Sequence, residues 1–483
     1  MADAERVLEL FTELNTIPRC SKHEERVAAW IVEWAHTRGF ATDRDEVGNV
    51  LISVPGAGAG VDRPPVVVQG HMDMVCEKTP ESTHNFDQDA VPVITEGDWI
   101  HAKDTTLGAD NGIAVAMALA AAESETPRPR LEILITVDEE TGLTGAQGVQ
   151  PGWLTGRQLL NIDSEDEGVF TVGCAGGRNT FLTVPRVLHR TPEGFVARQV
   201  VISGLKGGHS GVEIHLQRAN ANVLLTRFLQ AIDVARVREG TPHFSLASIS
   251  GGSAHNAIPR DARATLTLQT ENVRWLDEFA AEFEKTVQAE YAAVEPGISL
   301  TVKEIDAPDE VMTDESAARL LDLLAALPDG VIRMSSDVEG LVETSTNLAT
   351  IREKDGIEIG TSQRSSFSSR LAEVAEQIEA AGRLADASLR VTSQYAAWEP
   401  DMESSLLERC LRVYRGEFDR EPVVEVIHAG LECGVIGSKY PGMEMISFGP
   451  TIKGAHSPEE RLQKSALEQV WTFLTALLAS YAA

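Results

Sequence analysis

Five short polar phrases place histidines and carboxylates directly after apolar runs of the chain. Imidazole nitrogens with Asp and Glu oxygens form a mixed ligand shell that suits Zn²⁺, and Mn²⁺ or Co²⁺ can use a similar one. The sequence therefore predicts two divalent metal ions that activate a hydrolytic water. The phrases are Gln69-Gly70-His71-Met72-Asp73, Gly108-Ala109-Asp110-Asn111-Gly112, Asp138-Glu139-Glu140, Asn161-Ile162-Asp163 and Gly454-Ala455-His456-Ser457-Pro458.

The first phrase pairs a histidine with a carboxylate two residues later. Residues two apart in an extended chain face the same side, so His71 and Asp73 point together. Asp73 can then accept the second N–H of His71 and fix its tautomer. Gly70 lets the backbone turn close to a ligand. An ordinary surface loop after a strand is an equally good interpretation of this phrase alone.

The second phrase opens a predicted helix. Asp110 could be only a helix N-cap, which is a common structural role for Asp. The glycines on both sides, Gly108 and Gly112, leave room for close metal approach, and one carboxylate can bridge two cations. Bridged metals lie about 3.5–4 Å apart in two-metal hydrolases.

Three consecutive acids follow the apolar residues 131–137. Asp138, Glu139 and Glu140 would repel each other unless cations or protons intervene. Adjacent glutamates at a strand end can point in different directions, so one can ligate metal while the other takes a proton from water. A solvated acidic turn is the alternative, but residues 141–146 predict tight backbone instead.

The last two phrases supply the remaining ligands. Asp163 is the first acid after the apolar pair Leu159-Leu160 and is predicted to lie deepest in its loop. His456 stands between small residues, before the predicted final helix over 458–481. Each has a structural interpretation by itself, and only the five phrases together favour a metal centre.

Length and charge limit the remaining functions. A chain of 483 residues exceeds one ordinary core and predicts at least two domains. The formal net charge of −31 disfavours nucleic-acid or anionic-membrane partners, because the surface would repel phosphate. The N-terminus lacks a signal pattern, and no run of about 18 apolar residues could span a bilayer. We therefore expect a cytoplasmic protein.

The cysteines agree with that location. They are odd in number and lack CxxC spacing, so the sequence predicts buried thiols in a reducing cytosol and no disulfide framework. The five residues are Cys20, Cys76, Cys174, Cys410 and Cys433.

The hydrophobic patterns predict an α/β fold, with a mainly parallel sheet flanked by helices. Helices are expected over 5–11, 25–31 (capped by Ser21) and 113–123. Strands are expected over 49–54, 65–68, 131–137 and 159–162. The pattern of residues 187–396 predicts an inserted α+β lid domain. Residues 397–483 again show the alternating helices and strands of the first part of the chain. The predicted catalytic domain is therefore discontinuous, formed by 1–186 and 397–483.

The five phrases, in this order and spacing, resemble the co-catalytic zinc aminoacylase/carboxypeptidase/dipeptidase superfamily. The strings over 69–75, 106–115, 137–146, 205–216 and 447–462 are similar to its aminoacyl-histidine (Xaa-His) dipeptidase branch. The resemblance runs essentially from end to end and implies a cytosolic, carnosine-hydrolysing type of enzyme. It also implies a homodimer.

The resemblance also implies individual roles. His71 and Asp163 would bind one metal, Glu140 and His456 the other, and Asp110 would bridge them, followed by a cis peptide bond. Asp73 would orient His71, and Glu139 would be the general base that later protonates the leaving amine.

Substrate contacts are assigned less directly. His209, in Gly207-Gly208-His209-Ser210-Gly211, is the candidate donor to the tetrahedral oxyanion when the lid closes, with an ordinary loop histidine as the alternative. Asn256 could hold the substrate's terminal carboxylate or backbone. Arg370 and Gly430 are further candidates for substrate binding. No pocket residue in the sequence demonstrates a preference for a C-terminal histidine.

Three functions thus remain. The leading one is a metal-dependent dipeptidase acting on small peptides such as Xaa-His. An N-acyl-amino-acid deacylase or carboxypeptidase of the same superfamily is the nearest alternative, since the sequence does not identify the acid that would bind a free amine. A non-catalytic metal-binding protein is disfavoured because Asp73 and Glu139 are both present.

Overall fold

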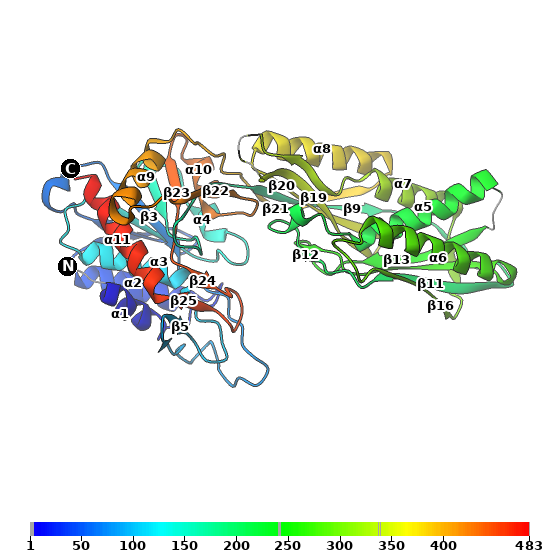
Figure 1. The fold of residues 1–483 in the computed structure, drawn as a ribbon, viewed down its shortest axis with the longest axis horizontal. Helices are drawn as coiled ribbons and strands as arrows, with labels where there is room; N and C mark the ends of the chain where they lie inside the picture. Colours follow the sequence, from blue (N-terminus) through cyan, green and yellow to red (C-terminus); the bar gives the residue numbers. More distant parts are fainter. Residues whose placement is uncertain (1–3, 240–242, 337, 339, 483) are drawn as a thin grey trace. The chain divides into compact units, whose positions relative to one another are not determined.

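The computed structural model describes residues 4–239, 243–336, 338 and 340–482, and the chain divides into two compact units (Figure 1). Unit 1 comprises Met1–Cys174, Trp398–Val426 and Leu431–Ala483, and unit 2 comprises Ala175–Ala397 and Ile427–Gly430. The first boundary lies before residue 186 because β9 (Gly176–Val184) pairs with strands β20 and β21 of unit 2.

Unit 1 contains an eight-stranded sheet in the order β1-β2-β6-β3-β7-β23-β8-β22. Its four central strands, from β6 to β23, run parallel, and the pairs β1-β2, β2-β6 and β23-β8 are antiparallel. The predicted α/β fold with a parallel centre is confirmed. The strands are β1 (Ala41–Arg44), β2 (Val50–Val54), β3 (Val66–His71), β6 (Leu131–Thr136), β7 (Gln158–Asn161), β8 (Val169–Cys174), β22 (Val423–Ile427) and β23 (Glu444–Ser447).

Seven helices belong to the described part of unit 1. One of them, α3, is rich in alanine and buried along almost its whole length, which lets it pack closely on β3. The strand β3 is itself buried at every position, as expected for a parallel strand covered on both faces. The helices are α1 (Ala4–Leu14), α2 (Glu25–Thr37), α3 (Ala109–Glu123), α4 (Thr144–Gly148), α9 (Ser405–Phe418), α10 (Glu432–Lys439) and α11 (Lys464–Ser480).

A small four-stranded sheet of unit 1 shortens the predicted final helix. That helix begins at Lys464 and not at residue 458, because Arg461–Gln463 form strand β25, which pairs with β5 and β24. The segment before it is therefore a loop closed by a strand. The other members of this sheet are β4 (Ile94–Glu96), β5 (Trp99–His101) and β24 (Ile452–Lys453).

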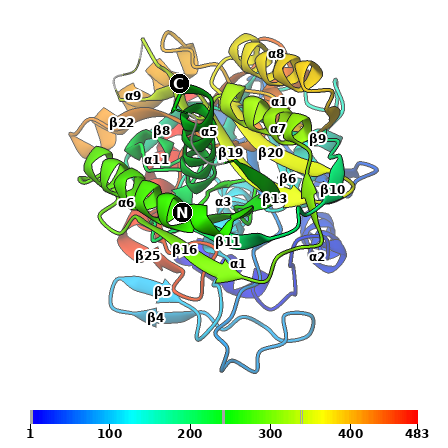
Figure 2. The same ribbon diagram turned by 90° about the vertical axis from the view of Figure 1, so that its right-hand side faces the viewer.

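Unit 2 is an α+β structure whose large sheet follows the order β16-β11-β15-β13-β19-β20-β9-β21, with β18 beside β19. Helices α5 (Ala221–Glu239), α6 (Val273–Glu290), α7 (Asp314–Ala326) and α8 (Ser368–Leu384) pack on this sheet and face the viewer in Figure 2. Its strands are β9, β11 (Phe195–Ser203), β13 (Phe244–Gly251), β15 (Ala262–Gln269), β16 (Ser299–Ile305), β18 (Gly330–Met334), β19 (Val342–Glu353), β20 (Ile357–Ser365) and β21 (Ser388–Tyr395).

Two short pairs complete the strands of unit 2. One joins β12 (Gly208–His209) to β14 (Ala257–Ile258), so the predicted oxyanion donor lies on a paired strand. The other joins β10 (Leu188–Arg190) to β17 (Glu310–Met312).

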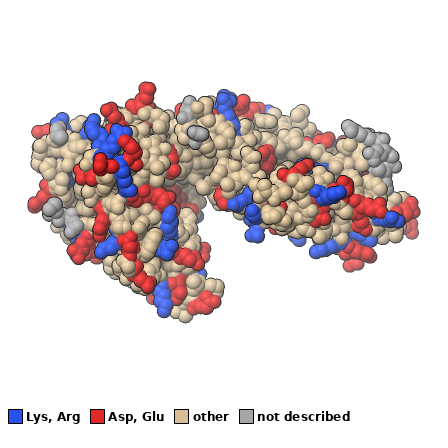
Figure 3. All heavy atoms as spheres, in the orientation of Figure 1, with Lys and Arg blue, Asp and Glu red and all other residues tan. Residues whose placement is uncertain are grey.

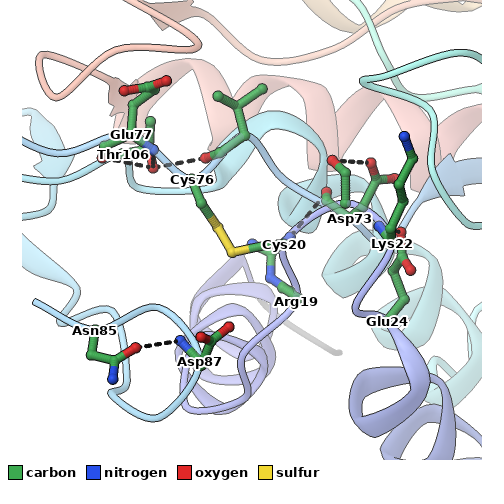
Figure 4. The surroundings of a disulfide bond; sticks show 12 residues. Arg19, Cys20, Lys22, Glu24, Asp73, Cys76, Glu77, Asn85, Asp87 and Thr106 are labelled. Atoms are coloured by element: carbon green, nitrogen blue, oxygen red, sulfur yellow. Dashed lines mark hydrogen bonds between the residues drawn. A yellow bond between two sulfur atoms is a disulfide. The ribbon is translucent and has the colours of Figure 1, made fainter.

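Two of the five cysteines form a disulfide, which the sequence did not predict. Cys20 is bonded to Cys76, with the two Cα atoms 5.7 Å apart (Figure 4). The expectation of thiols throughout is therefore wrong for this pair, since folding brings together residues separated by 56 positions. Cys174, Cys410 and Cys433 are free and buried, as predicted.

Acidic side chains are spread over the visible surface of both units, as the net charge requires (Figure 3). Among the described residues, no helix combines the length and apolar character needed to cross a membrane.

Candidate active site

The five polar phrases all belong to unit 1 and gather at the carboxyl ends of its central strands. His71 ends β3, while Glu139 and Glu140 follow β6 and Asp163 follows β7. Parallel strands finish at the same edge of a sheet, so these side chains meet there. Asp110 comes from the start of α3 and His456 from the loop between β24 and β25.

The first group of potential ligands surrounds His71. Its Nε2 lies 3.2 Å from Asp110 Oδ1 and 3.5 Å from Asp163 Oδ1. Its Nδ1 lies 3.3 Å from Asp73 Oδ1. One ring nitrogen thus faces the two carboxylates, and the other faces the carboxylate that can fix the tautomer.

The second group surrounds His456. Its Nε2 lies 3.0 Å from Asp110 Oδ2 and 3.1 Å from Glu140 Oε2. The two oxygens of Asp110 therefore face different histidines. In each group the potential ligand atoms lie within 4.8 Å of one another.

This donor set fits a pair of divalent cations. Two imidazoles and three carboxylates provide nitrogen and oxygen ligands, without thiolate. The carboxylates are packed closely enough to repel each other, and bound cations would relieve that repulsion. Glu140 Oε1 is buried without a hydrogen-bond partner among the described residues, as suits a ligand atom.

The backbone at Asp110 turns its side chain toward both histidines. Asp110 has φ −79° and ψ 107°, outside the helical region, and its peptide bond to Asn111 is cis, as the resemblance implied. Asn111 Oδ1 accepts the backbone N–H of His71 at 3.1 Å, and its Nδ2 donates to Ile162 O at 2.7 Å. The amide of Asn111 therefore ties together the ends of β3 and β7.

Asp73 is fully buried and organises the turn that carries the two glutamates. Its carboxylate accepts the backbone N–H groups of Glu139 and Glu140 at 3.1 and 3.3 Å, and the Ser21 hydroxyl at 2.8 Å. Ser21 is thus not the cap of α2, whose N-cap residue is Glu24. Asp73 orients both a potential ligand and the candidate base.

Electrostatics distinguish the groups of the cluster. Burial raises the pKa of Glu139 well above its ordinary value, which suits a group that takes up a proton near neutral pH. Burial alone would lower the pKa of His71, but Asp163, Asp110 and Asp73 raise it well above its ordinary value. Hydrogen bonds to Asp110 and Glu140 raise the pKa of His456 to about 11.

A second polar cluster lies within unit 2 and contains His209. Its Nδ1 accepts the backbone N–H groups of Gly211 and Val212 at 3.2 and 3.0 Å, so in the neutral ring Nε2 carries the hydrogen. Burial and the nearby Arg364 lower the pKa of His209. This histidine is therefore a neutral donor through Nε2.

Arg364 and His428 complete this cluster. An added Cβ on Gly211 would meet His428 O, Arg364 Nε and His209 Cε1 within 3.0 Å, which shows how closely the three residues gather. Arg364 Nη1 donates to Tyr395 Oη at 3.0 Å. Arg364 Nε and His428 Nδ1 are buried without hydrogen-bond partners among the described residues.

The three predicted substrate residues have different surroundings in unit 2. Asn256 is exposed, and its carbonyl accepts the N–H of Ser210, which places it beside His209. Gly430 packs on the Tyr395 ring, where an added Cβ would lie 2.6 Å from Cε2. Arg370 is 41% exposed and pairs with Glu373 at 2.7 Å, so its guanidinium is held at the surface of α8.

Comparison with known proteins bears directly on this arrangement. The model of Peptidase family M20/M25/M40 matches residues 67–480. The chain belongs to this family. It is 38% identical to the cytosol non-specific dipeptidase of Escherichia coli (strain K12) over 476 residues, which cover 97% of this chain and 96% of that protein.

Solved structures agree with the family assignment. The aminoacylhistidine dipeptidase of Vibrio alginolyticus matches this M20 peptidase with a TM-score of 0.90 at 39% identity, over 98% of this chain and 96% of that one. The aminopeptidase PepT of Bacillus cereus, at 14% identity and a TM-score of 0.58 over 100% and 99% of the chains, shares the fold. The resemblance noted in the sequence is confirmed.

The structure gives the glycines around Asp110 a role that the sequence did not predict. An added Cβ on either Gly108 or Gly112 would lie 2.5 Å from Arg19 Nη2. In this M20 peptidase both glycines therefore make room for a buried guanidinium, while room for metal approach stays a prediction. Gly108 also has φ +71°, which favours glycine.

Three further candidate residues were not singled out in the sequence. Arg364 and His428 lie far from His209 in sequence, and the fold brings all three together around Gly211. Glu432 is fully buried, and its Oε2 accepts the Thr136 hydroxyl at 2.6 Å and the Gln69 amide at 2.5 Å, directly below the ends of β6 and β3. The only available signal was an acid placed between apolar residues and Cys433.

Proposed function

We propose that this M20 peptidase is a two-metal dipeptidase that hydrolyses Xaa-His and other dipeptides. The proposal rests mainly on the two oxygens of the Asp110 carboxylate, because Oδ1 faces His71 and Oδ2 faces His456. A carboxylate in this position can bridge two cations. His71 and Asp163 would hold one ion, and Glu140 and His456 would hold the other.

The residues around the ions would divide the chemistry between them. Bound divalent ions would supply an acidified water and polarise the scissile carbonyl. Glu139 would take the proton from that water and deliver it to the leaving amine, and its raised pKa supports this exchange. Asp73 would keep His71 in the ligating tautomer while its oxygens hold the Glu139–Glu140 turn.

Unit 2 would supply donors for the substrate. His209, neutral and carrying its hydrogen on Nε2, has the protonation state needed to stabilise a tetrahedral oxyanion. Arg364 has a buried Nε without a hydrogen-bond partner in the described part of the chain, so it suits the substrate's terminal carboxylate better than the surface-paired Arg370. Asn256 and Gly430 stay predictions for the same substrate, as does homodimer formation.

The names of the relatives support a dipeptide substrate but differ in breadth. The Escherichia coli relative is a non-specific dipeptidase and the Vibrio relative an aminoacylhistidine dipeptidase. We therefore place Xaa-His peptides within a broader range of dipeptides. The first name also supports a cytosolic location, although the Cys20–Cys76 disulfide is unusual for a reducing compartment.

A substrate panel tests the proposal. The protein, loaded in turn with Zn²⁺, Mn²⁺ or Co²⁺, is assayed with Ala-His, Ala-Ala and N-acetyl-histidine. We expect rapid cleavage of the two dipeptides and little cleavage of the acylated compound. Cleavage of N-acetyl-histidine alone would favour the deacylase alternative, and failure with every peptide despite bound metal would favour a non-catalytic protein.

A further inference from the structure

The turn from Leu107 to Asp110 carries the residue that is shared by both ligand groups. Its backbone is not held by helix hydrogen bonds alone, because Asp110 and Asn111 have non-helical dihedral angles. The position of the Asp110 carboxylate therefore depends on what binds the polar backbone atoms of this turn.

One side of the turn is bound by a buried carboxylate. Glu460 is 2% exposed, and its Oε2 accepts the N–H groups of Leu107 and Gly108 at 2.7 and 2.9 Å. Its Oε1 accepts the N–H of Asp110 at 3.1 Å. Three N–H groups of one turn thus converge on one side chain.

The other side is bound by a buried guanidinium. Arg19 is 1% exposed, and its Nη2 donates to Gly108 O at 2.6 Å. Its Nη1 donates to Met72 O at 3.2 Å and Asp73 O at 3.3 Å, directly after His71. Arg19 therefore links the Asp110 turn to the end of β3.

Both residues connect elements that carry ligands. Glu460 lies four residues after His456, so one loop supplies a potential ligand and also the group that holds the bridging turn. A buried charge is costly unless it is paired and hydrogen-bonded, and each of these has several partners. Packing alone would not offset the free energy needed to bury these two charges.

We propose that Glu460 and Arg19 are positioning residues that clamp the Leu107–Asp110 turn and thereby hold the Asp110 carboxylate between two metal ions. Both side chains are buried, and neither belongs to the two groups of potential metal ligands. The inference rests on the proposed two-metal site, and it adds that metal affinity is set by this pair of buried charges as well as by the ligands.

The Glu460→Gln substitution tests the clamp with little change of shape. A glutamine has one acceptor oxygen, so its amide NH₂ must face at least one N–H of the turn. Glu459→Gln is the matched control, because it makes the same charge change at the adjacent exposed residue. Circular dichroism of the metal-free proteins checks that each variant is folded.

Co²⁺ titration of the metal-free proteins, followed by visible absorption, gives the readout. We expect wild type and Glu459→Gln to bind two ions alike, and Glu460→Gln to lose affinity by about 10–100-fold with an altered spectrum of the loaded site. Loss of packing alone would lower stability without changing the spectrum. Wild-type affinity and spectrum in folded Glu460→Gln would overturn the clamp.

Arg19→Lys gives a second test if Glu460→Gln does not fold. Lysine keeps the charge but cannot reach Gly108, Met72 and Asp73 carbonyls together, so weaker Co²⁺ binding is expected and unchanged binding would contradict the proposal. A wild-type protein that binds fewer than two ions would refute the proposed function itself, and the inference with it.

Discussion

The two potential ligand histidines of unit 1, His71 and His456, and the histidines of the unit 2 cluster have opposite electrostatic surroundings. In unit 1, carboxylates raise the pKa values of His71 and His456. In unit 2, burial and Arg364 lower the pKa of His209, and burial lowers that of His428 to about 3. The acidic surroundings of the unit 1 histidines thus favour cations, whereas the surroundings of the unit 2 histidines favour a neutral ring that can donate a hydrogen bond to an anion.

Under the proposed function, this difference would let a very acidic protein bind a substrate with a carboxylate. The carboxylates of unit 1 draw cations, which would offset their charge. Arg364 and the neutral His209 of unit 2 provide hydrogen-bond donors, and Glu213 is a nearby acid that accepts the backbone N–H of His209 at 2.8 Å. The hypothesis is therefore that unit 1 binds the metal ions and unit 2 supplies hydrogen-bond donors for the substrate. The following variants test it.

The largest effect is expected from Asp110→Ala. Both ligand groups lose their shared member, so metal binding and turnover should be lost together, beyond the roughly 10⁴-fold upper limit of a missing general base. Metal analysis beside a dipeptide assay checks this, with the exposed Asp166→Ala as control. An Asp110→Ala protein with two bound ions would contradict the bridging role.

Glu139→Gln should separate metal binding from catalysis. The proton acceptor is removed while the ligands remain, so kcat should fall by about 10²–10⁴-fold and both ions should be retained. Stopped assays with the metal-loaded variant measure this. Near-normal turnover would remove Glu139 from the role of base.

Lysine substitutions of Arg364 and Arg370, both in unit 2, give a matched pair of variants. Arg364→Lys should raise KM by about 10-fold or more, the value of a charged hydrogen bond of about 1.5–3 kcal/mol, with a smaller effect on kcat. Arg370→Lys should change neither constant, since its side chain is bound at the surface to Glu373. The reverse pattern would restore Arg370 as the carboxylate ligand.

Acid should destabilise unit 2 through His428. Its folded pKa of about 3 lies below the unfolded value of 6.5, so the unfolded state binds more protons between these pH values. The free energy of unfolding should fall by up to about 1.4 kcal/mol per pH unit below 6.5. Hydrogen exchange of unit 2 peptides at pH 7 and 5 measures this change in the free energy of unfolding. The His428→Gln substitution should reduce the dependence of that free energy on pH. Equal dependence in that variant would exclude His428 as the cause.

Metal binding to unit 1 should also be linked to proton release, although its two potential ligand histidines have raised and not lowered pKa values. Neighbouring carboxylates raise the pKa values of His71 and His456, which favours their protonated forms in the metal-free protein, and a histidine must lose that proton to ligate. Zn²⁺ binding should therefore release protons and tighten as pH rises. Calorimetry in buffers of different ionisation enthalpy measures the release, and a heat independent of buffer would contradict it.

The sequence was most informative where chemistry follows a strand directly. His71, Glu140 and Asp163 end parallel strands, so their convergence follows from the rule that such strands share an edge. His456 could be predicted only because a second histidine was required, and the resemblance supplied its role. The α/β fold was predictable from the same alternation of strands and helices.

What the sequence could not give depends on long-range packing. Nothing near Cys20 signals Cys76, and nothing near Gly108 signals that its missing side chain leaves space for Arg19. The start of α11 was misplaced because Arg461–Gln463 pair with β5, a contact between segments about 360 residues apart. Arg364 was not a candidate from the sequence because its burial, which distinguishes it from the exposed Arg370, cannot be inferred from the local pattern.

Anomalous diffraction at the zinc edge, from crystals of the zinc-loaded protein, tests the central claim most directly. The account predicts two zinc peaks about 3.5–4 Å apart, with Asp110 Oδ1 and Oδ2 bound to different ions. One ion should also contact His71 and the other His456. A single peak, or two peaks that do not share Asp110, would contradict it.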